Sequence, residues 1–163
     1  MVVVARNAAT KRSRLKLIYD ADITLAVLKG EGSGVVYSIG VDIVETSRIR
    51  EMLSKHANAF LRRVFTEQEI SYCNRMKRPE EHLAARFAAK EAVMKAIGAG
   101  MAATGARFHE IEVGRGKRGN PSIRLRGKIR ELARAQGVSR LHVSLSHTRT
   151  AAIAFVVAEA ESE

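Results

Sequence analysis

The chain has 163 residues, of which 46% are hydrophobic, and it carries a formal net charge of +11. This length allows one domain with a hydrophobic core, and no apolar run approaches the length that spans a membrane. Trp is absent and aromatic residues are few, which argues against a base-stacking surface, although the charge would attract a polyanion. The lone Cys73 excludes an internal disulfide and favours a reducing, cytoplasmic compartment.

The first 35 residues differ in composition from the rest of the chain. A short basic cluster at 11–14 and a moderately apolar stretch at 15–28 precede Gly30-Glu31-Gly32-Ser33-Gly34, which is typical of a flexible linker. We therefore predict an N-terminal extension and linker over residues 1–35, outside the folded domain, and a single domain over residues 36–163.

Residues 35–44 are rich in β-branched side chains and are predicted to form a strand. Asp42 is the only acidic residue in this stretch. A carboxylate among apolar neighbours needs a partner or a metal. A helix cap or a strand-end turn would explain Asp42 equally well.

The next segment is predicted to be a helix from Arg48 to about Phe65, interrupted near residues 57–58, with Thr46 and Ser47 as N-terminal caps. Its polar side is basic and contains Arg48, Arg50, Lys55, Arg62 and Arg63. Such charges usually form a solvated face, but they could also dock an acidic partner.

Two further helices are predicted from capping and composition. Thr66 and Glu69 match a capping box that opens a short helix ending near Arg75. After the basic turn Lys77-Arg78-Pro79, the longest predicted helix runs from Glu80 to Ile97, because alanine is abundant there and Gly98 supplies a stop.

Within this long helix, Glu91 and Lys95 are four residues apart and are expected to be neighbours. A carboxylate beside an ammonium, with Arg86 and Lys90 about a turn earlier, could hold a metal and a phosphate together. On spacing alone, an ordinary surface salt bridge is the simpler interpretation.

The C-terminal third predicts the strands of a small sheet. Strands are expected at 108–113, 122–126, 141–147 and 151–158, with a short helix at 127–136 that stops at Gly137. His147 lies at a strand end, where side chains reach ligands, although a lone histidine there is more often structural than catalytic. These elements predict an α+β fold in which a mostly antiparallel sheet packs on the long central helix.

Three motifs occur in a fixed order along the chain. They are Gly40-Val41-Asp42 followed by Arg48-Ile49, then Arg86-Phe87-Ala88-Ala89-Lys90-Glu91-Ala92 with Lys95, and then Val143-Ser144-Leu145-Ser146-His147-Thr148. Over residues 36–159 the chain resembles the holo-acyl-carrier-protein synthases, the short bacterial type of 4′-phosphopantetheinyl transferase. The resemblance implies Mg²⁺-dependent transfer of 4′-phosphopantetheine from coenzyme A to a serine of apo acyl carrier protein, with release of adenosine 3′,5′-bisphosphate, in fatty-acid biosynthesis.

The resemblance also implies roles for individual residues. Asp42 and Glu91 match the family's metal-binding carboxylates, and Lys95 matches a lysine that contacts the pyrophosphate. The positions that match coenzyme A-binding residues are Lys77, Arg78, Arg86, Ser146 and His147. The positions that match the docking surface for acyl carrier protein are Arg48, Met52 and Lys55, whereas Asn58 stands where relatives commonly have a basic residue.

The family's short members are homotrimers with active sites between subunits. We therefore expect Asp42, Glu91 and Lys95 from one subunit and Ser146 and His147 from the next. The general base stays open: Glu91 could orient a water or a metal-bound water could accept the serine proton, and histidine is less favoured. Two other functions are compatible with parts of the sequence, namely a basic nucleic-acid-binding domain without catalytic activity and a catalytically silent trimeric scaffold.

Overall fold

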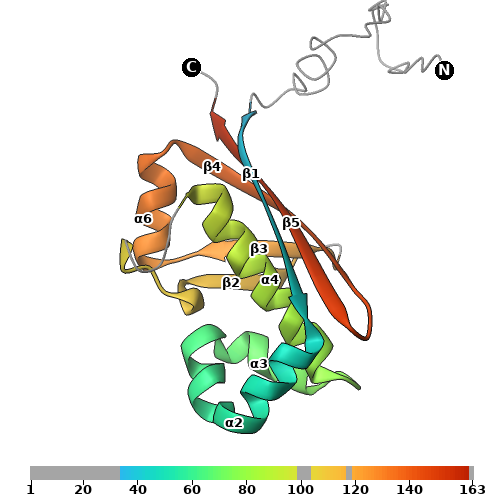
Figure 1. Ribbon diagram of the computed structural model, residues 1–163. Coiled ribbons are helices and arrows are strands. Elements are labelled where there is room, and N and C mark those ends of the chain that lie inside the picture. The colour runs from blue at the N-terminus through green and yellow to red at the C-terminus, as the bar shows by residue number, and fades with distance from the viewer. Residues whose placement is uncertain (1–33, 99–103, 117–118, 162–163) are drawn as a thin grey trace, which may run out of the picture. The chain divides into compact units, whose positions relative to one another are not determined.

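The structure is a computed structural model that describes residues 34–98, 104–116 and 119–161 (Figure 1). Its elements are β1 (Gly34–Glu45), α2 (Thr46–Val64), α3 (Glu67–Asn74), α4 (Pro79–Ile97), the 3-10 helix η1 (Phe108–Glu110), β2 (Ile111–Arg115), β3 (Pro121–Leu125), α6 (Gly127–Ala135), β4 (Val138–His147) and β5 (Ala151–Glu161). The predicted extension lies, except for its last two residues, outside the described residues. In the described part of the chain, no helix is both long and apolar enough to cross a membrane.

The strands form two antiparallel sheets. In the first sheet β5 lies between β1 and β4, and in the second β2 pairs with β3. The predicted α+β class and antiparallel pairing are therefore confirmed, with two small sheets in place of one. Residues 108–110, predicted to begin a strand, instead form η1, and the carbonyl oxygen of Phe108 accepts a hydrogen bond from a buried lysine, Lys90.

Helix α4 packs closely against the three-stranded sheet (Figure 1). Most of its small side chains are fully buried, including Ala84, Ala88, Ala89 and Ala92. A Cβ atom added to Gly40 of β1 would collide with the carbonyl oxygen of Ala92 and lie 2.8 Å from the amide nitrogen of Ala96. The close approach of β1 to α4 therefore requires glycine at this position.

Helix α2 begins differently from the prediction. Thr46 and Ser47 lie inside the helix, and Glu45 occupies the N-cap position without a side-chain capping bond. The amide of Thr46 donates to the carbonyl oxygen of Thr150 at 2.9 Å, so the loop between β4 and β5 replaces the predicted cap. The predicted interruption is present at His56, where φ is −144° and ψ is 33°.

Helix α3 begins with the predicted capping box of Thr66 and Glu69. The same Glu69 carboxylate is buried, accepts from Nζ of Lys90 at 2.8 Å, and accepts from the amide of Val113 at 3.0 Å. Lys90 is fully buried and also donates to the carbonyl oxygens of Phe108 and Ile111. Lys90 therefore connects α3, α4, η1 and β2. The sequence suggested that it could help to hold a phosphate, but its burial prevents contact with a ligand.

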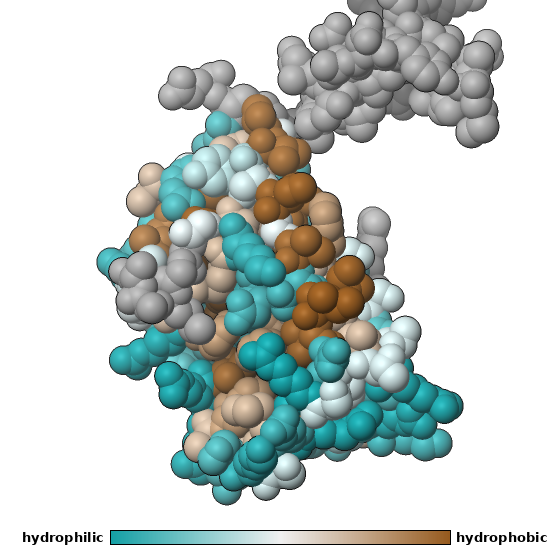
Figure 2. Space-filling view, in the orientation of Figure 1, coloured by the Kyte–Doolittle hydropathy of each residue, from teal (hydrophilic) through white to brown (hydrophobic). Residues whose placement is uncertain are grey.

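Strand β5, which includes the strand predicted at 151–158, is buried on one face only. Ala152, Ala154 and Val156 are buried, and the alternate residues point outward. Together with β1 they form an apolar strip whose side chains are 37% to 67% exposed: Val35, Val36, Tyr37, Ile39, Val41, Ile43, Ile153 and Phe155. Figure 2 shows an apolar band along this part of the surface.

Candidate active site

An acidic and basic cluster forms where β1 crosses α4. Asp42 comes from β1, and Glu91 and Lys95 lie one turn apart on α4. Nζ of Lys95 donates to Oδ1 of Asp42 at 2.8 Å and to the carbonyl oxygen of Val41 at 3.0 Å. The lysine therefore pairs with Asp42, and not with Glu91 as its spacing in the sequence suggested.

The surroundings of Glu91 disfavour its ionised form. Burial raises the pKa of Glu91, and the neighbouring Asp42 carboxylate raises it further, while Lys95 and Arg48 oppose the shift. The hydrogen bond to Asp42 raises the pKa of Lys95. The Lys95 side chain is 54% exposed and that of Asp42 16%, so the ion pair reaches solvent from its lysine side.

The two carboxylates fit a magnesium ion. Among the residues that the structure describes, no group of three or more His, Cys, Asp or Glu side chains could hold a metal by itself. Magnesium commonly takes one or two protein carboxylates and completes its coordination with water and substrate phosphates. Burial and then the charge of Asp42 raise the pKa of Glu91, and a cation bound between the two carboxylates would relieve their repulsion.

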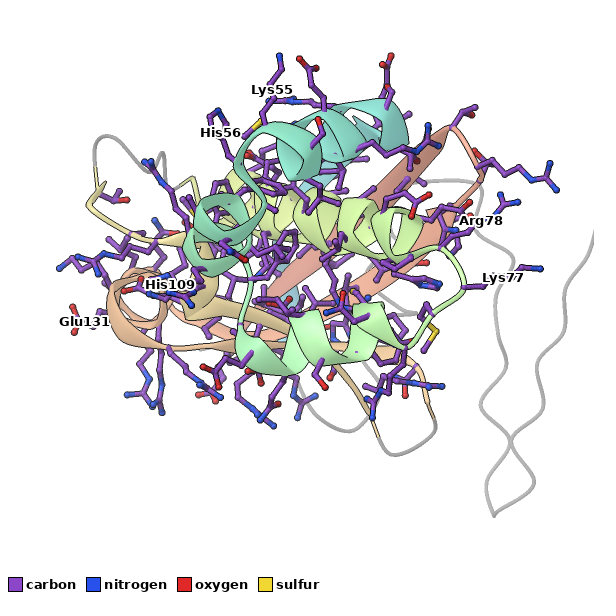
Figure 3. All side chains as sticks on the ribbon, turned by 90° about the horizontal axis from the view of Figure 1, so that it is seen from below. Lys55, His56, Lys77, Arg78, His109 and Glu131 are labelled. Atoms are coloured by element: carbon purple, nitrogen blue, oxygen red, sulfur yellow. The ribbon has the colours of Figure 1, made fainter. Side chains whose placement is uncertain are left out.

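A second charged cluster lies at the N-terminal end of α4. Nη1 of Arg78 lies 3.0 Å from Oε1 of Glu81, and Nδ1 of His147 lies 3.6 Å from Oε2 of the same carboxylate. The hydrogen bond from Arg78 lowers the pKa of Glu81, and burial followed by the charge of His147 lowers the pKa of His82. Figure 3 shows Lys77 and Arg78 together on the turn before α4.

Glu81 therefore brings together two of the predicted coenzyme A-binding residues, Arg78 and His147. Ser146 is exposed beside His147 on β4. Glu81 and Glu91 are ten residues apart on one helix, which corresponds to about 15 Å along its axis. We call Arg78, Glu81 and His147 the histidine cluster, and Asp42 with Glu91 the carboxylate pair. Within one chain, the two groups are thus separate.

Arg86 is less accessible than a nucleotide-binding residue was expected to be. It is 6% exposed, its guanidinium lies 4.2 Å from the ring centroid of Tyr72, and Nη1 donates to the carbonyl oxygen of His82 at 3.3 Å. It lines a pocket of about 500 Å³ together with Arg75 and Arg115. The motif gave no indication of this burial, because the stacking partner Tyr72 comes from another helix.

A larger pocket of about 820 Å³ lies between α2 and the segment around η1, and we call it the α2 pocket. Its residues are basic or apolar: Arg48, Ile49, Met52, Phe60, Arg62, Arg63, Val64, Phe87, Ala106, Arg107, Phe108 and His109. The structure thus places two predicted docking residues, Arg48 and Met52, on its wall. The third, Lys55, pairs with Glu51 at 2.6 Å and projects from the outer side of α2 (Figure 3).

Several residues of the α2 pocket were not predicted from the sequence. Phe60, Phe87 and Phe108 come from α2, α4 and η1, and neighbouring rings lie 5.3 to 6.4 Å apart between their centroids. Their meeting depends on the packing of three elements, so no local pattern could indicate it. Arg48 connects this pocket to the carboxylates, because its charge acts on the pKa of Glu91.

The chain is similar to known proteins in sequence and in fold. Residues 38–156 match the family model of the 4′-phosphopantetheinyl transferase superfamily. A holo-[acyl-carrier-protein] synthase of Halothermothrix orenii is 42% identical over 125 residues, which are 77% of this chain and 98% of that protein.

Two solved structures are similar in fold and sequence. A holo-[acyl-carrier-protein] synthase of Neisseria meningitidis has a TM-score of 0.69 and 35% identity, over 76% of this chain and 98% of that one. A holo-(acyl-carrier-protein) synthase of Bacillus anthracis in complex with CoA (3′,5′-ADP) has a TM-score of 0.62 and 36% identity, over 77% and 98% of the two chains. The chain therefore belongs to the 4′-phosphopantetheinyl transferase superfamily and, within it, to the family of holo-[acyl-carrier-protein] synthases.

Proposed function

We propose that this protein transfers the 4′-phosphopantetheine group of coenzyme A to a serine of apo acyl carrier protein, in the cytoplasm and in the service of fatty-acid biosynthesis. The observation that carries the proposal is the group of Asp42, Glu91 and Lys95, assembled from β1 and α4 in a member of this family. The complex of the Bacillus anthracis relative with CoA supports coenzyme A as the donor.

In the proposed reaction, the serine oxygen forms a bond to the phosphorus that carries pantetheine, and the bond from this phosphorus to the leaving phosphate of adenosine 3′,5′-bisphosphate breaks. Positioning and charge stabilisation account for most of the catalysis in such phosphoryl transfers. Lys95 lies beside Asp42, where it would stabilise the leaving phosphate or give it a proton. Asp42 and Glu91 would hold Mg²⁺, which offsets charge on the pyrophosphate when it is bound. Glu91 would also orient the water that accepts the serine proton.

The N-terminal end of α4 would bind the nucleotide part of coenzyme A. Lys77, Arg78 and His147 supply cationic or hydrogen-bonding groups there, next to the exposed Ser146. Arginine and lysine suit this task, because charge-assisted hydrogen bonds to phosphate are stronger than neutral ones.

We further propose that the active enzyme is a homotrimer with shared active sites. Two observations support an assembly. The histidine cluster and the carboxylate pair of one chain are about 15 Å apart along α4, so a neighbouring copy can supply His147 to the pair. The apolar strip on β1 and β5 leaves several large side chains exposed, and contiguous exposed apolar patches commonly mark protein interfaces.

Acyl carrier protein would dock at the α2 pocket. Its lining combines the basic residues Arg48, Arg62, Arg63 and Arg107 with apolar side chains. The resemblance implies an acidic recognition helix on the partner, and such a helix would find both opposite charge and apolar contact here.

The proposed reaction is tested by the intact mass of apo acyl carrier protein after incubation with the full-length protein, coenzyme A and Mg²⁺. We expect a gain of one phosphopantetheine group, its loss with EDTA and its loss in Glu91→Gln. The matched control is Glu131→Gln, because Glu131 is exposed on α6 and pairs with Lys128, which is outside the candidate active site (Figure 3). No gain with several apo carriers, from a folded and assembled sample, would reject the proposal.

A further inference from the structure

A second basic hollow lies between β3, α6 and β4, and we call it the arginine groove. It encloses about 570 Å³ and is lined by Ile123, Arg124, Leu125, Arg126, Arg130, Ala133, Arg134, Val138, Ser139, Arg140 and Leu141. It shares no lining residue with the α2 pocket, and none of the candidate active-site residues lines it. The function proposed above therefore gives it no role.

The groove holds far more positive than negative charge. All five arginines are exposed. A single carboxylate, that of Glu112, lies 2.9 Å from Arg124 and 3.3 Å from Arg126 and is itself buried. Within the described ranges, no carboxylate lies within ion-pair distance of Arg130, and none does so for Arg134 or Arg140.

The arginines of α6 repeat at a spacing that places like charges side by side. Arg126 is the N-cap residue, and Arg130 and Arg134 follow at intervals of four residues. Like charges at this spacing destabilise a helix. The nearby carboxylate of Glu131 pairs with Nζ of Lys128 at 3.3 Å and is within ion-pair distance of neither Arg130 nor Arg134. An anion bound between the guanidinium groups would remove the repulsion.

The chemistry of the lining narrows the class of anion. A planar guanidinium bonds phosphate oxygens in pairs, and five of them from three elements can surround more than one phosphate. Successive arginines on α6 are about 6 Å apart along the axis, so two of them can contact different phosphates of one linked chain. The lining contains no aromatic ring on which a base could stack, and its volume lies in the range of small-molecule sites.

We propose that the arginine groove binds a small molecule with two or more linked phosphates, one per chain and separately from the transfer reaction. Inorganic oligophosphates and nucleotides share this chemistry. A single-stranded nucleic acid would be a different occupant, and it is disfavoured by the absence of aromatic residues in the lining.

The test uses the full-length Lys95→Ala protein, in which phosphate binding at the candidate active site is weakened, and inorganic triphosphate as the probe. Calorimetry is expected to show one triphosphate per chain. Adding Arg130→Gln and Arg134→Gln should weaken binding by about tenfold or more. The matched control, Lys128→Gln with Arg50→Gln, removes the same charge outside the groove and should bind as the Lys95→Ala parent does. Equal loss in both pairs, or no loss in the groove pair, would overturn the proposal.

Two further measurements complete the test. ATP that binds more tightly than triphosphate, through the same arginines, would identify a nucleotide, whereas equal affinity would identify the phosphate chain as the recognised part. A ten-nucleotide single strand that binds more tightly than either would overturn the proposal. Without ligand the groove variant should melt no lower than its parent, because like charges have been removed. Triphosphate should raise the Tm of the parent and of the control pair by more than it raises the Tm of the groove pair. If the glutamine pair melts lower, the variant Arg130→Lys with Arg134→Lys replaces it, because lysine keeps the charge but cannot donate two parallel hydrogen bonds to a phosphate. An unchanged affinity of this lysine pair for triphosphate would overturn the proposal that the guanidinium groups bind phosphate oxygens in pairs.

Discussion

At the scale of single residues, Glu91 shows how a candidate metal ligand opposes stability. Burial and Asp42 raise its pKa above the ordinary value of 4.5, so the folded protein binds the Glu91 proton more tightly than the unfolded chain does. The resulting stabilisation is present below pH 4.5 and is lost as the pH rises through the raised pKa. At neutral pH the ionised side chain therefore destabilises the metal-free protein.

We predict that Glu91→Gln is more stable than the parent protein at pH 7 in EDTA, although it has no transfer activity. The advantage should shrink as the pH falls toward 4, where the parent carboxyl is protonated. Thermal melts across this range measure it, with Glu131→Gln as the control that shows no such trend. An advantage that grows toward acid would contradict the assigned direction of the pKa shift.

Lys90 is the neighbour of Glu91 in sequence but has an entirely structural environment. It is fully buried and bonded to Glu69. Lys90→Met should reduce the free energy of unfolding by about 3–5 kcal/mol, because it leaves the Glu69 carboxylate buried without a cation. Urea unfolding measures this loss. The double variant Lys90→Met with Glu69→Gln should recover part of the stability, and a double variant as unstable as the single one would contradict the explanation.

At the scale of elements, α2 combines a docking surface with a connection to the carboxylates. Arg48→Glu should raise the KM for apo acyl carrier protein about tenfold while changing the KM for coenzyme A little, because it reverses charge on the wall of the α2 pocket. Lys55→Glu is the matched control. Lys55 is paired with Glu51 and does not line the pocket, so we expect a smaller effect. Equal effects of both variants, or of Arg48→Glu on both substrates, would argue against docking at this pocket.

The sequence predicted elements best where a local rule decides the structure. The capping box at Thr66 and the left-handed stop at Gly98, with φ of 64°, are confirmed because both depend only on neighbouring residues. The start of α2 and the 3-10 turn η1 were predicted wrongly, because their backbone groups bond to Thr150 and Lys90, which are distant in sequence. The burial of Lys90 had no local signal for the same reason.

In the candidate site, too, local motifs could be read from the sequence and contacts between distant residues could not. The motifs identified Asp42, Glu91 and Lys95, and the packing of β1 on α4 brings Asp42 and Lys95 within 2.8 Å across 53 residues of sequence. The choice of Asp42 over Glu91 as the partner of Lys95 could not be predicted, because helix spacing favours the i,i+4 pair.

At the scale of the whole molecule, the proposed shared site makes a prediction that a self-contained site does not. Lys95→Ala and His147→Ala subunits should each be inactive as pure trimers. When the two are mixed, unfolded and refolded together, some interfaces combine an intact Lys95 with an intact His147, and a fraction of the activity should return. The mass of the modified carrier protein measures it. Mixed trimers that stay inactive would indicate that each chain works with its own His147.

Gly40 is a position where even a small added side chain would disturb the packing of β1 on α4. The strand that carries Asp42 lies against α4 only because Gly40 has no side chain, and an added methyl group would meet backbone atoms of Ala92 and Ala96 that cannot rotate away. Substitution with alanine would therefore act as a spacer between strand and helix. The ion pair could be lost through added volume alone, with every charged group of the site still present.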